Sequence, residues 1–300
     1  MGTSLRKCRL AAGSLMLLGC CAFAWAPAWA DDGAAALPDL KRLSVEELSN
    51  LEVSSVSRTP EAVSGAAAAI YVITGEDVRR SGSTTLAEIL RQAPNLQVAR
   101  IDAGDYVVSA RGFSNTVSNK LLVLVDGRTV YTPLYSGVFW DLQNVVPADI
   151  DRVEVISGPG GTLWGSNAVN GVINVVSRDS SATQGAMLRL SGGNADVSGV
   201  AQYGGAIGDA FTYRVYGSGL RQGHTLTSAQ LSGQDSWDLY QGGFRSDWKA
   251  DADKITLQGD LQRGDNRPTV GTHIALNGGN VLGRWQHQLD TDSAVEVQAY

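Results

Sequence analysis

The residues with the greatest chemical potential in this sequence do not form a catalytic pattern. Three histidines, His224, His273 and His287, fall in segments expected to be strands or loops, and no Ser/His/Asp order, HExxH or paired-carboxylate motif is present. A glycine-rich run at 158–165 lacks the Lys-Ser/Thr pair of a phosphate-binding loop and the helix that should follow one. We therefore expect a protein that is not an enzyme and that holds no metal or other cofactor.

Residues 1–30 are expected to be an export signal. A positively charged start precedes an apolar run, Leu10–Phe23, that is too short to cross a bilayer as a helix. Cleavage after Ala28-Trp29-Ala30 is the favoured reading, and Leu17-Leu18-Gly19-Cys20 offers a lipid-attachment site as the alternative. All three cysteines lie in this segment, so cleavage after residue 30 would leave a chain without a thiol and exclude a disulfide framework.

The exported chain is acidic. The sequence has 24 Lys+Arg and 30 Asp+Glu, and loss of the three basic residues of the signal gives 21 − 30 = −9. A chain of this kind is a poor nucleic-acid binder, because phosphate contacts need clustered Lys and Arg. After the signal, no apolar run approaches the ~18 residues of a membrane-spanning helix, so insertion into a membrane would require a β-barrel.

Residues 31–57 are expected to form a polar leader and residues 58–180 a compact α+β domain. Thr74 with Asp77, and Thr85 with Glu88, have the spacing that caps the start of a helix. The run 121–125 is almost wholly apolar, which predicts a strand covered on both faces. The remaining strands are expected at 69–73, 96–101, 153–156 and 172–176.

From residue 185 to 300 the pattern changes to strict alternation of polar and apolar residues. In 254–262, for example, Ile255, Leu257 and Leu261 face one way and the polar residues the other. Such segments are typical of antiparallel transmembrane β-barrel strands, although a soluble antiparallel sheet alternates in the same way. About seven strands are expected, against ~22 in a large transporter barrel. The barrel is therefore expected to be incomplete, and the chain to be a fragment or a truncated gene product.

Five blocks of sequence between residues 90 and 176 resemble the plug domain of TonB-dependent outer-membrane receptors of the siderophore or cobalamin type. They occur in the order and at the spacing of that family, and the resemblance covers residues 52–178. One departure is Ser157, where the family usually has Arg, and this puts one plug-to-barrel ion pair in doubt. The blocks are LRQAPNLQV (90–98), ARGF (110–113), VLVDGR (123–128), DRVEVISGP (151–159) and LWGSNAVNGVINVV (163–176).

The resemblance implies structural roles inside the plug. Arg111, Arg152 and Glu154 are expected to contact the inner wall of the barrel, and an ordinary solvated strand pair is the alternative for the last two. Glycines are expected where the backbone turns sharply or approaches another strand closely. These plug glycines are Gly112, Gly127, Gly158, Gly165 and Gly171.

A short segment ahead of the plug resembles the TonB box, which the energy-coupling protein TonB of the inner membrane binds. Leu51–Ser57 is rich in small and β-branched residues and poor in charge, as strand addition to a partner requires. An unremarkable linker strand is the alternative. The box residues are Glu52, Val53, Ser54, Ser55 and Val56.

The resemblance places ligand binding on the outward loops of the plug, at 100–106, 112–119 and 129–141. Exposed aromatic side chains there would suit an aromatic or macrocyclic ligand. Packing against the inner barrel wall is the alternative for the aromatic residues of the third loop, 129–141. The candidate residues are Arg100, Tyr106, Phe113, Tyr131, Tyr135, Phe139 and Trp140.

These features predict a receptor in the outer membrane of a Gram-negative bacterium that imports a scarce nutrient complex with TonB as its energy source. The first candidate ligand is a ferric siderophore. Import of cobalamin, haem, a sugar or another metal complex stays an alternative, as does a truncated, non-transporting binding module. The expected partners are a TonB-type protein, the ligand and outer-membrane lipid, but no nucleic acid.

Overall fold

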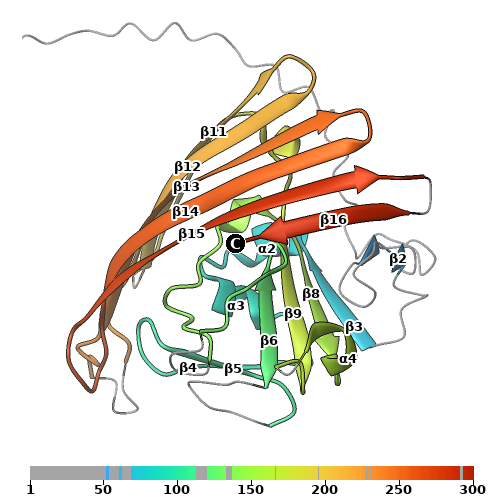
Figure 1. Cartoon of the computed structure of the whole chain (residues 1–300). Helices are drawn as coiled ribbons and strands as arrows, with labels where there is room; N and C mark the ends of the chain where they lie inside the picture. Colours follow the sequence, from blue (N-terminus) through green and yellow to red (C-terminus); the bar gives the residue numbers. More distant parts are fainter. Residues whose placement is uncertain are drawn as a thin grey trace, which may run out of the picture. The chain divides into compact units, whose positions relative to one another are not determined.

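The computed structural model describes most of the chain beyond residue 68 (Figure 1). All the described residues belong to one compact unit, Ala36–Tyr300. The expected export signal lies outside them. In the part of the chain described, no helix combines the length and the hydropathy needed to cross a membrane. The described residues are 52–53, 61–62, 69–112, 120–132, 137–165, 167–194, 196–226, 229, 231–290 and 293–300.

The plug, which we define as residues 69–180, is built around a mixed five-stranded sheet. Its strands follow the order β3-β8-β9-β6-β7, in which β6 and β9 are parallel and all other neighbours are antiparallel. The run 121–125 is the buried strand that the sequence predicts. The bounds are β3 Ala69–Thr74, β6 Leu121–Val125, β7 Arg128–Thr129, β8 Ile150–Ser157 and β9 Gly171–Ser177.

The two predicted helix caps of the plug are present. Helix α2 (Gly75–Ser81) begins at Thr74, whose Oγ1 accepts a hydrogen bond from the N–H of Asp77, while the Asp77 carboxylate accepts one from the N–H of Thr74. Helix α3 (Leu86–Leu90) begins at Thr85, whose side chain accepts from the N–H of Glu88. Each cap satisfies a main-chain donor that the first turn of a helix leaves free.

Shorter elements complete the plug. A two-stranded hairpin, β4 with β5, lies outside the main sheet. The 3₁₀ turns η2 and η3 precede β8 and follow β9, and a single helical turn, α4, lies inside the glycine-rich run. The bounds are β4 Gln97–Arg100, β5 Tyr106–Ser109, η2 Pro147–Asp149, η3 Ser180–Thr183 and α4 Gly161–Trp164.

The plug sheet has an apolar cluster on each face. One cluster includes Val123, Val153 and Ile173 from the sheet and Leu86 and Ile89 from α3. The other is smaller and joins strand residues of β6, β8 and β9 to Ala168, with Trp164 of α4 packed against it. Burial of both faces explains why the plug strands are nearly continuous apolar runs rather than alternating ones.

The barrel wall, which we define as residues 185–300, is a sheet of seven antiparallel strands paired in sequence order (Figure 1). Within the described part of the chain, the outer strands β10 and β16 each have one neighbour, so the sheet does not close. The predicted class, an α+β plug followed by antiparallel strands of an incomplete barrel, is confirmed. The bounds are β10 Gly185–Gly192, β11 Asp196–Ile207, β12 Phe211–Gln222, β13 Ser236–Ala250, β14 Asp253–Arg267, β15 Ile274–Gln288 and β16 Ala294–Ala299.

The predicted alternation along the wall corresponds to its two faces. On β14, Leu257 and Leu261 are exposed while Thr256 is buried. On β12, Val215 is exposed and Arg214 is buried. Polar side chains thus occupy the face turned to the plug and apolar side chains the opposite face, the arrangement of a barrel surrounded by lipid.

Candidate functional site

The end of the plug is attached to the wall through a buried ionic cluster on β13. The N–H and Oγ of Ser180 donate to Oδ2 of Asp247, over 2.8 and 2.7 Å. Arg245 pairs with Asp247 at 3.0 Å and also with Asp179, whose other oxygen accepts from Lys254 Nζ at 2.7 Å. Arg245 and Asp247 are only 4% and 1% exposed. A buried pair of this kind persists only when its remaining donors and acceptors are also satisfied.

A second attachment joins η2 of the plug to β12. Arg214 Nε lies 3.5 Å from Asp149 Oδ2, and its Nη1 donates to the main-chain oxygen of Arg178 at 3.1 Å. Burial raises the pKa of the Asp149 carboxyl, an effect that the positive charge of Arg214 opposes. The cation therefore offsets part of the cost of burying the charged form of this acid.

The β6–β7 turn makes a third attachment. Asp126 has a φ of 50° and Gly127 a φ of 77°, the left-handed conformations of a tight two-residue hairpin turn. The Asp126 carboxylate accepts bonds of 2.8 Å from the N–H and Oγ of Ser177 and from Gln258 Nε2. Its main-chain oxygen accepts from Arg284. One turn residue thus connects β9 of the plug to β14 and β15 of the wall.

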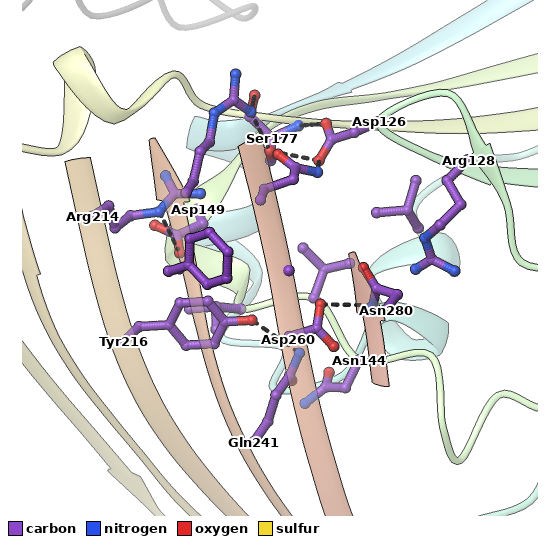
Figure 2. Close-up of a pocket in the computed structure, with 17 residues that line it drawn as sticks. Asp126, Arg128, Asn144, Asp149, Ser177, Arg214, Tyr216, Gln241, Asp260 and Asn280 are labelled. Carbon is purple, nitrogen blue, oxygen red and sulfur yellow. Dashed lines mark hydrogen bonds and ion pairs between the residues drawn. The ribbon is translucent and has the colours of Figure 1, made fainter. Parts of the chain in front are cut away.

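A polar cavity of about 60 Å³ lies among these attachments (Figure 2). Asp149 and Arg214 point toward each other on one side of it, and Asp260 accepts a bond of 2.9 Å from Asn280 on the other. Several buried polar atoms facing the interface lack a protein partner, among them Asn144 Oδ1 and Gln241 Oε1. Since a buried water occupies roughly 10–15 Å³ by this measure and bonds about three such groups, the cavity suits a small cluster of waters.

Arg152 and Glu154 meet inside the plug. Arg152 pairs with Glu154 at 2.7 Å and with Asp151 at 2.8 Å, and Glu154, which is 0% exposed, also accepts from Asn174. Burial lowers the pKa of Arg152, but the two carboxylates outweigh it and the pKa is raised. Arg152 also borders a larger cavity, about 680 Å³, whose wall side includes Arg284 and Glu296.

Contact of the three predicted residues Arg111, Arg152 and Glu154 with the barrel stays a prediction. The bonds of Arg152 and Glu154 described above are all within the plug. Arg111 is exposed and has a φ of 57°, in the left-handed region. The structure thus brings Arg152 and Glu154 together and leaves Arg111 apart from them.

The predicted ligand residues divide into buried and accessible ones. Tyr106 and Trp140 are only 3% and 8% exposed and belong to the apolar core of the plug. Arg100 is exposed and lies 5.8 Å from the centre of the Tyr106 ring. Tyr131 and Phe139 are half-buried. Phe113 and Tyr135 lie outside the described residues, and a ligand contact stays a prediction for all of these side chains.

The predicted TonB box is described in part. Glu52 and Val53 form the short strand β1, which pairs antiparallel with β2 (Glu61–Ala62), and Val53 is buried. Ser54, Ser55 and Val56 lie outside the described residues. The first two residues of the box are thus able to take part in strand pairing, which is the property that strand addition to a partner would use.

The predicted plug glycines occupy positions that only glycine fits easily. Gly171 begins β9, and a Cβ there would lie 2.4 Å from the main-chain oxygen of Ile156, closer than real contacts allow. The other four have φ values in the left-handed region, which side chains disfavour. These four are Gly112 at 84°, Gly127 at 77°, Gly158 at 115° and Gly165 at 86°.

The residues that join plug and wall were not singled out by the sequence. Arg214, Arg245, Asp247 and Asn266 all lie on the polar side of an alternating strand. Residue type was the one indication that the sequence offered, because charged and amide side chains that become buried need partners. Among the described residues, no group of three or more His, Cys, Asp or Glu side chains could hold a metal ion.

Comparison with known proteins agrees with this architecture. Residues 62–172 match the family described as the TonB-dependent Receptor Plug Domain. A protein called vitamin B12 transporter BtuB from Vibrio vulnificus is 32% identical over 145 residues, which are 47% of this chain and 23% of that protein. Its namesake from Vibrio cholerae is 28% identical over 197 residues, 65% of this chain and 31% of that protein. The chain thus spans less than a third of these relatives.

Solved structures of outer-membrane receptors share the fold. The ferripyoverdine receptor of Pseudomonas aeruginosa superposes with a TM-score of 0.65 at 15% identity, over 82% of this chain and 35% of that one. The ferric-catecholate import receptor Fiu from E. coli K12 has a TM-score of 0.62 at 18% identity, over 80% and 38%. The copper transporter OprC has 0.62 at 19%, over 76% and 36%. At these identities the likeness concerns the fold alone.

A small α+β domain joined by buried ionic contacts to the polar face of an alternating sheet defines the class of plugged outer-membrane barrels. Within that class, the matched plug domain and the order of the five motifs identify the chain as the N-terminal portion of a TonB-dependent outer-membrane receptor. The family is one of receptors and transporters in the outer membrane of Gram-negative bacteria, so the predicted localisation is confirmed.

Proposed function

We propose that this receptor imports a scarce nutrient complex across the outer membrane, using energy delivered by a TonB-type protein. The observation that carries the proposal is the plug itself, which matches the family over 62–172 and is joined by buried side chains to the polar face of the wall. A domain in that position obstructs the lumen, so passage of a ligand requires the plug to move or to rearrange.

A ferric siderophore remains the first candidate ligand, and the sequence relatives support cobalamin as the second. The ferripyoverdine and ferric-catecholate receptors share the fold, but the proteins related in sequence are called vitamin B12 transporters. Both ligand classes are large metal chelates. Equilibrium binding of labelled cyanocobalamin and of a panel of ferric siderophores to the purified full-length receptor would separate them, because only the true ligand should bind at submicromolar concentration.

Energy coupling is proposed to pass through residues 52–56. In the structure Val53 pairs with Glu61 of β2. For TonB to add a strand to this segment, the β1–β2 pairing must open or its free edge must be used. A bound ligand can favour the released state only by binding that state more tightly than the paired one.

The Val53→Pro variant tests this coupling. Proline removes the main-chain N–H at the box and should prevent strand addition. We expect uptake of the ligand to fall at least tenfold, while binding of the ligand to whole cells stays at the parental level. Val53→Ala, which keeps the N–H, is the matched control and should transport normally. Parental uptake by the proline variant would refute the assignment of the box.

A further inference from the structure

The loop between β4 and β5 is attached to the inner wall of the barrel. Ala103 is fully buried and, with Leu142 of the plug packed alongside, joins an apolar cluster on the otherwise polar face of the wall. A Cβ at Gly104 would lie 3.0 Å from the carboxamide of Asn266, so the loop backbone touches β14 directly. The wall residues of this cluster are Leu220, Trp237, Leu239 and Leu276.

Three carboxyl groups of the plug converge at this contact. Nδ2 of Asn266 donates to Oδ1 of Asp105 and to Oδ2 of Asp141, each over 3.2 Å. Asp102 Oδ1 accepts from the N–H groups of Gly104 and Asp105. Asp102 and Asp141 are buried, and Asn266 is 0% exposed with no partner for its Oδ1. We call Asp102, Asp105, Asp141 and Asn266 the docking cluster.

The charged groups around the docking cluster do not neutralise it. Arg100 of β4 donates to the main-chain oxygens of Asp102 and Ala103 rather than to a carboxylate. From the wall, Asp235 lies close to Ala103 and brings a further acid, and Nδ1 of His224 bonds the main-chain oxygen of Asp235. Tyr106 reaches Gln222 of β12 at 3.5 Å. Buried carboxyl groups that converge on one amide, without a cation paired to them, favour the uptake of a proton.

We propose that the docking cluster binds a proton and so makes attachment of the outward plug loops to the barrel wall depend on the pH outside the cell. A proton fits better than a metal ion, because the described residues form no group that could hold one. That these plug loops lie on the outer side of the membrane rests on the proposed function. Asn266 lies at the end of β14 beside the connection 268–273, and such longer connections face the outside in outer-membrane barrels.

The direction of the pH effect follows from the environment of the acids. Burial, reinforced by the charges of Asp102 and Asp141, raises the pKa of Asp105 to about 6, and burial also raises that of Asp141. The attached loop therefore favours the protonated acid, so attachment is strongest below the ordinary pKa of 3.8 and weakens as the pH rises through about 6. For Asp105, a pKa of 3.8 in the detached loop and of about 6 in the attached loop gives an attachment constant about tenfold larger at pH 5 than at pH 7.5.

Labelling of a buried thiol measures this attachment. An Ala103→Cys variant of the full-length receptor places a thiol under the loop, and all three natural cysteines of the sequence precede residue 22. Outer membranes carrying this variant would be treated with a maleimide between pH 5 and pH 7.5. Each rate would be divided by the rate for the urea-unfolded protein at the same pH, which removes the titration of the thiol itself. We expect protection to fall about tenfold across this range.

Two asparagine variants and one histidine variant test which side chains cause the pH dependence of protection. Asp105→Asn in the Ala103→Cys background should give protection that is high and depends much less on pH, and Asp141→Asn should flatten the profile in the same direction. His224→Gln should leave the parental slope unchanged. A flat parental profile, an unaltered slope in both asparagine variants, or loss of the slope in His224→Gln would each overturn the proposal.

The result of the labelling experiment does not depend on transport by the receptor. Labelling requires neither ligand nor TonB, and exchange of main-chain amides in residues 100–106 provides a second measurement without the added cysteine. A receptor that fails to import any tested nutrient but shows the pH profile would contradict the proposed function alone. Normal import with pH-independent protection would contradict the docking cluster alone.

Discussion

Single buried charges determine how the plug and the wall are joined. Asp247 is the best example, since one carboxylate accepts from Ser180, Arg245 and Thr256 in a position that is almost free of solvent. Asp238 lies on the same strand and pairs with Arg221, whose side chain is 69% exposed. The two acids share a strand and a type of partner, but they differ in burial.

Substitution of these two aspartates should therefore have unequal effects. Asp247→Asn removes the charge opposite buried Arg245 and places an amide donor among donors, so we expect the free energy of plug unfolding to fall by about 3 kcal/mol. Asp238→Asn weakens a surface pair that solvent screens, so it should leave the free energy of plug unfolding almost unchanged. Urea titration of the purified receptor, followed by protease accessibility of the plug, measures both. Equal effects of the two substitutions would contradict the assigned role of burial.

At the scale of helices and strands, much of the structure is predictable because the determining interactions are local. The caps at Thr74 and Thr85 need only residues three positions apart, and alternation in 185–300 reports directly on two faces of a sheet. The strands of the wall are nonetheless longer than the ten or so residues expected, reaching 15 in β13, β14 and β15. Glycines interrupt the hydrophobic pattern there without ending the strand.

Cross-strand tyrosines account for two glycines of the wall, one in β11 and one in β13. Gly205 lies opposite Tyr213, and Gly243 lies opposite Tyr216, in the register of the sheet. A Cβ on Gly205 would lie 2.5 Å from the Tyr213 hydroxyl, and one on Gly243 would lie 2.7 Å from the Tyr216 ring. Each ring therefore covers the glycine of the neighbouring strand and protects its backbone. A single sequence gives no register, and the pairing could not be predicted.

The cap of α2 gives a prediction at this scale. Thr74→Ala removes the acceptor for the N–H of Asp77 and should lower the free energy of plug unfolding by about 1 kcal/mol. Thr74→Ser keeps the acceptor and is the matched control, expected within about 0.5 kcal/mol of the parent. The same urea titration applies. A loss as large in the serine variant as in the alanine variant would show that the methyl group, rather than the cap, stabilises this position.

For the whole molecule, the contacts between plug and wall lay beyond prediction because they join residues far apart in sequence. Asn266 meets Asp105 and Asp141 across more than a hundred residues. The aromatic residues Tyr106 and Trp140 illustrate the same limit. Their type suits ligand binding and core packing equally, and only the tertiary structure shows that both are buried.

The connections between wall strands predict the orientation of the receptor in the membrane. The link between β12 and β13 spans 223–235, whereas that between β13 and β14 is the two-residue turn 251–252. Short turns face the periplasm and longer loops the outside. An epitope inserted after Ala229 should be labelled by antibody on intact cells, and one inserted after Asp251 only after the outer membrane is opened. Surface labelling at residue 251 alone would reverse the orientation.

The order of strands in the plug sheet determines how many strands can detach from the sheet in one step. Strand β3 is the first strand of the plug and lies at the edge of the sheet, where β8 is its one neighbour among the residues described. The opposite end of the plug is held by Ser180 and Asp179 against β13. Tension entering from the N-terminal side would thus meet one ladder of backbone bonds, while β8, β9, β6 and β7 stayed paired. Detaching the six residues of β3 would release roughly 20 Å of extended polypeptide.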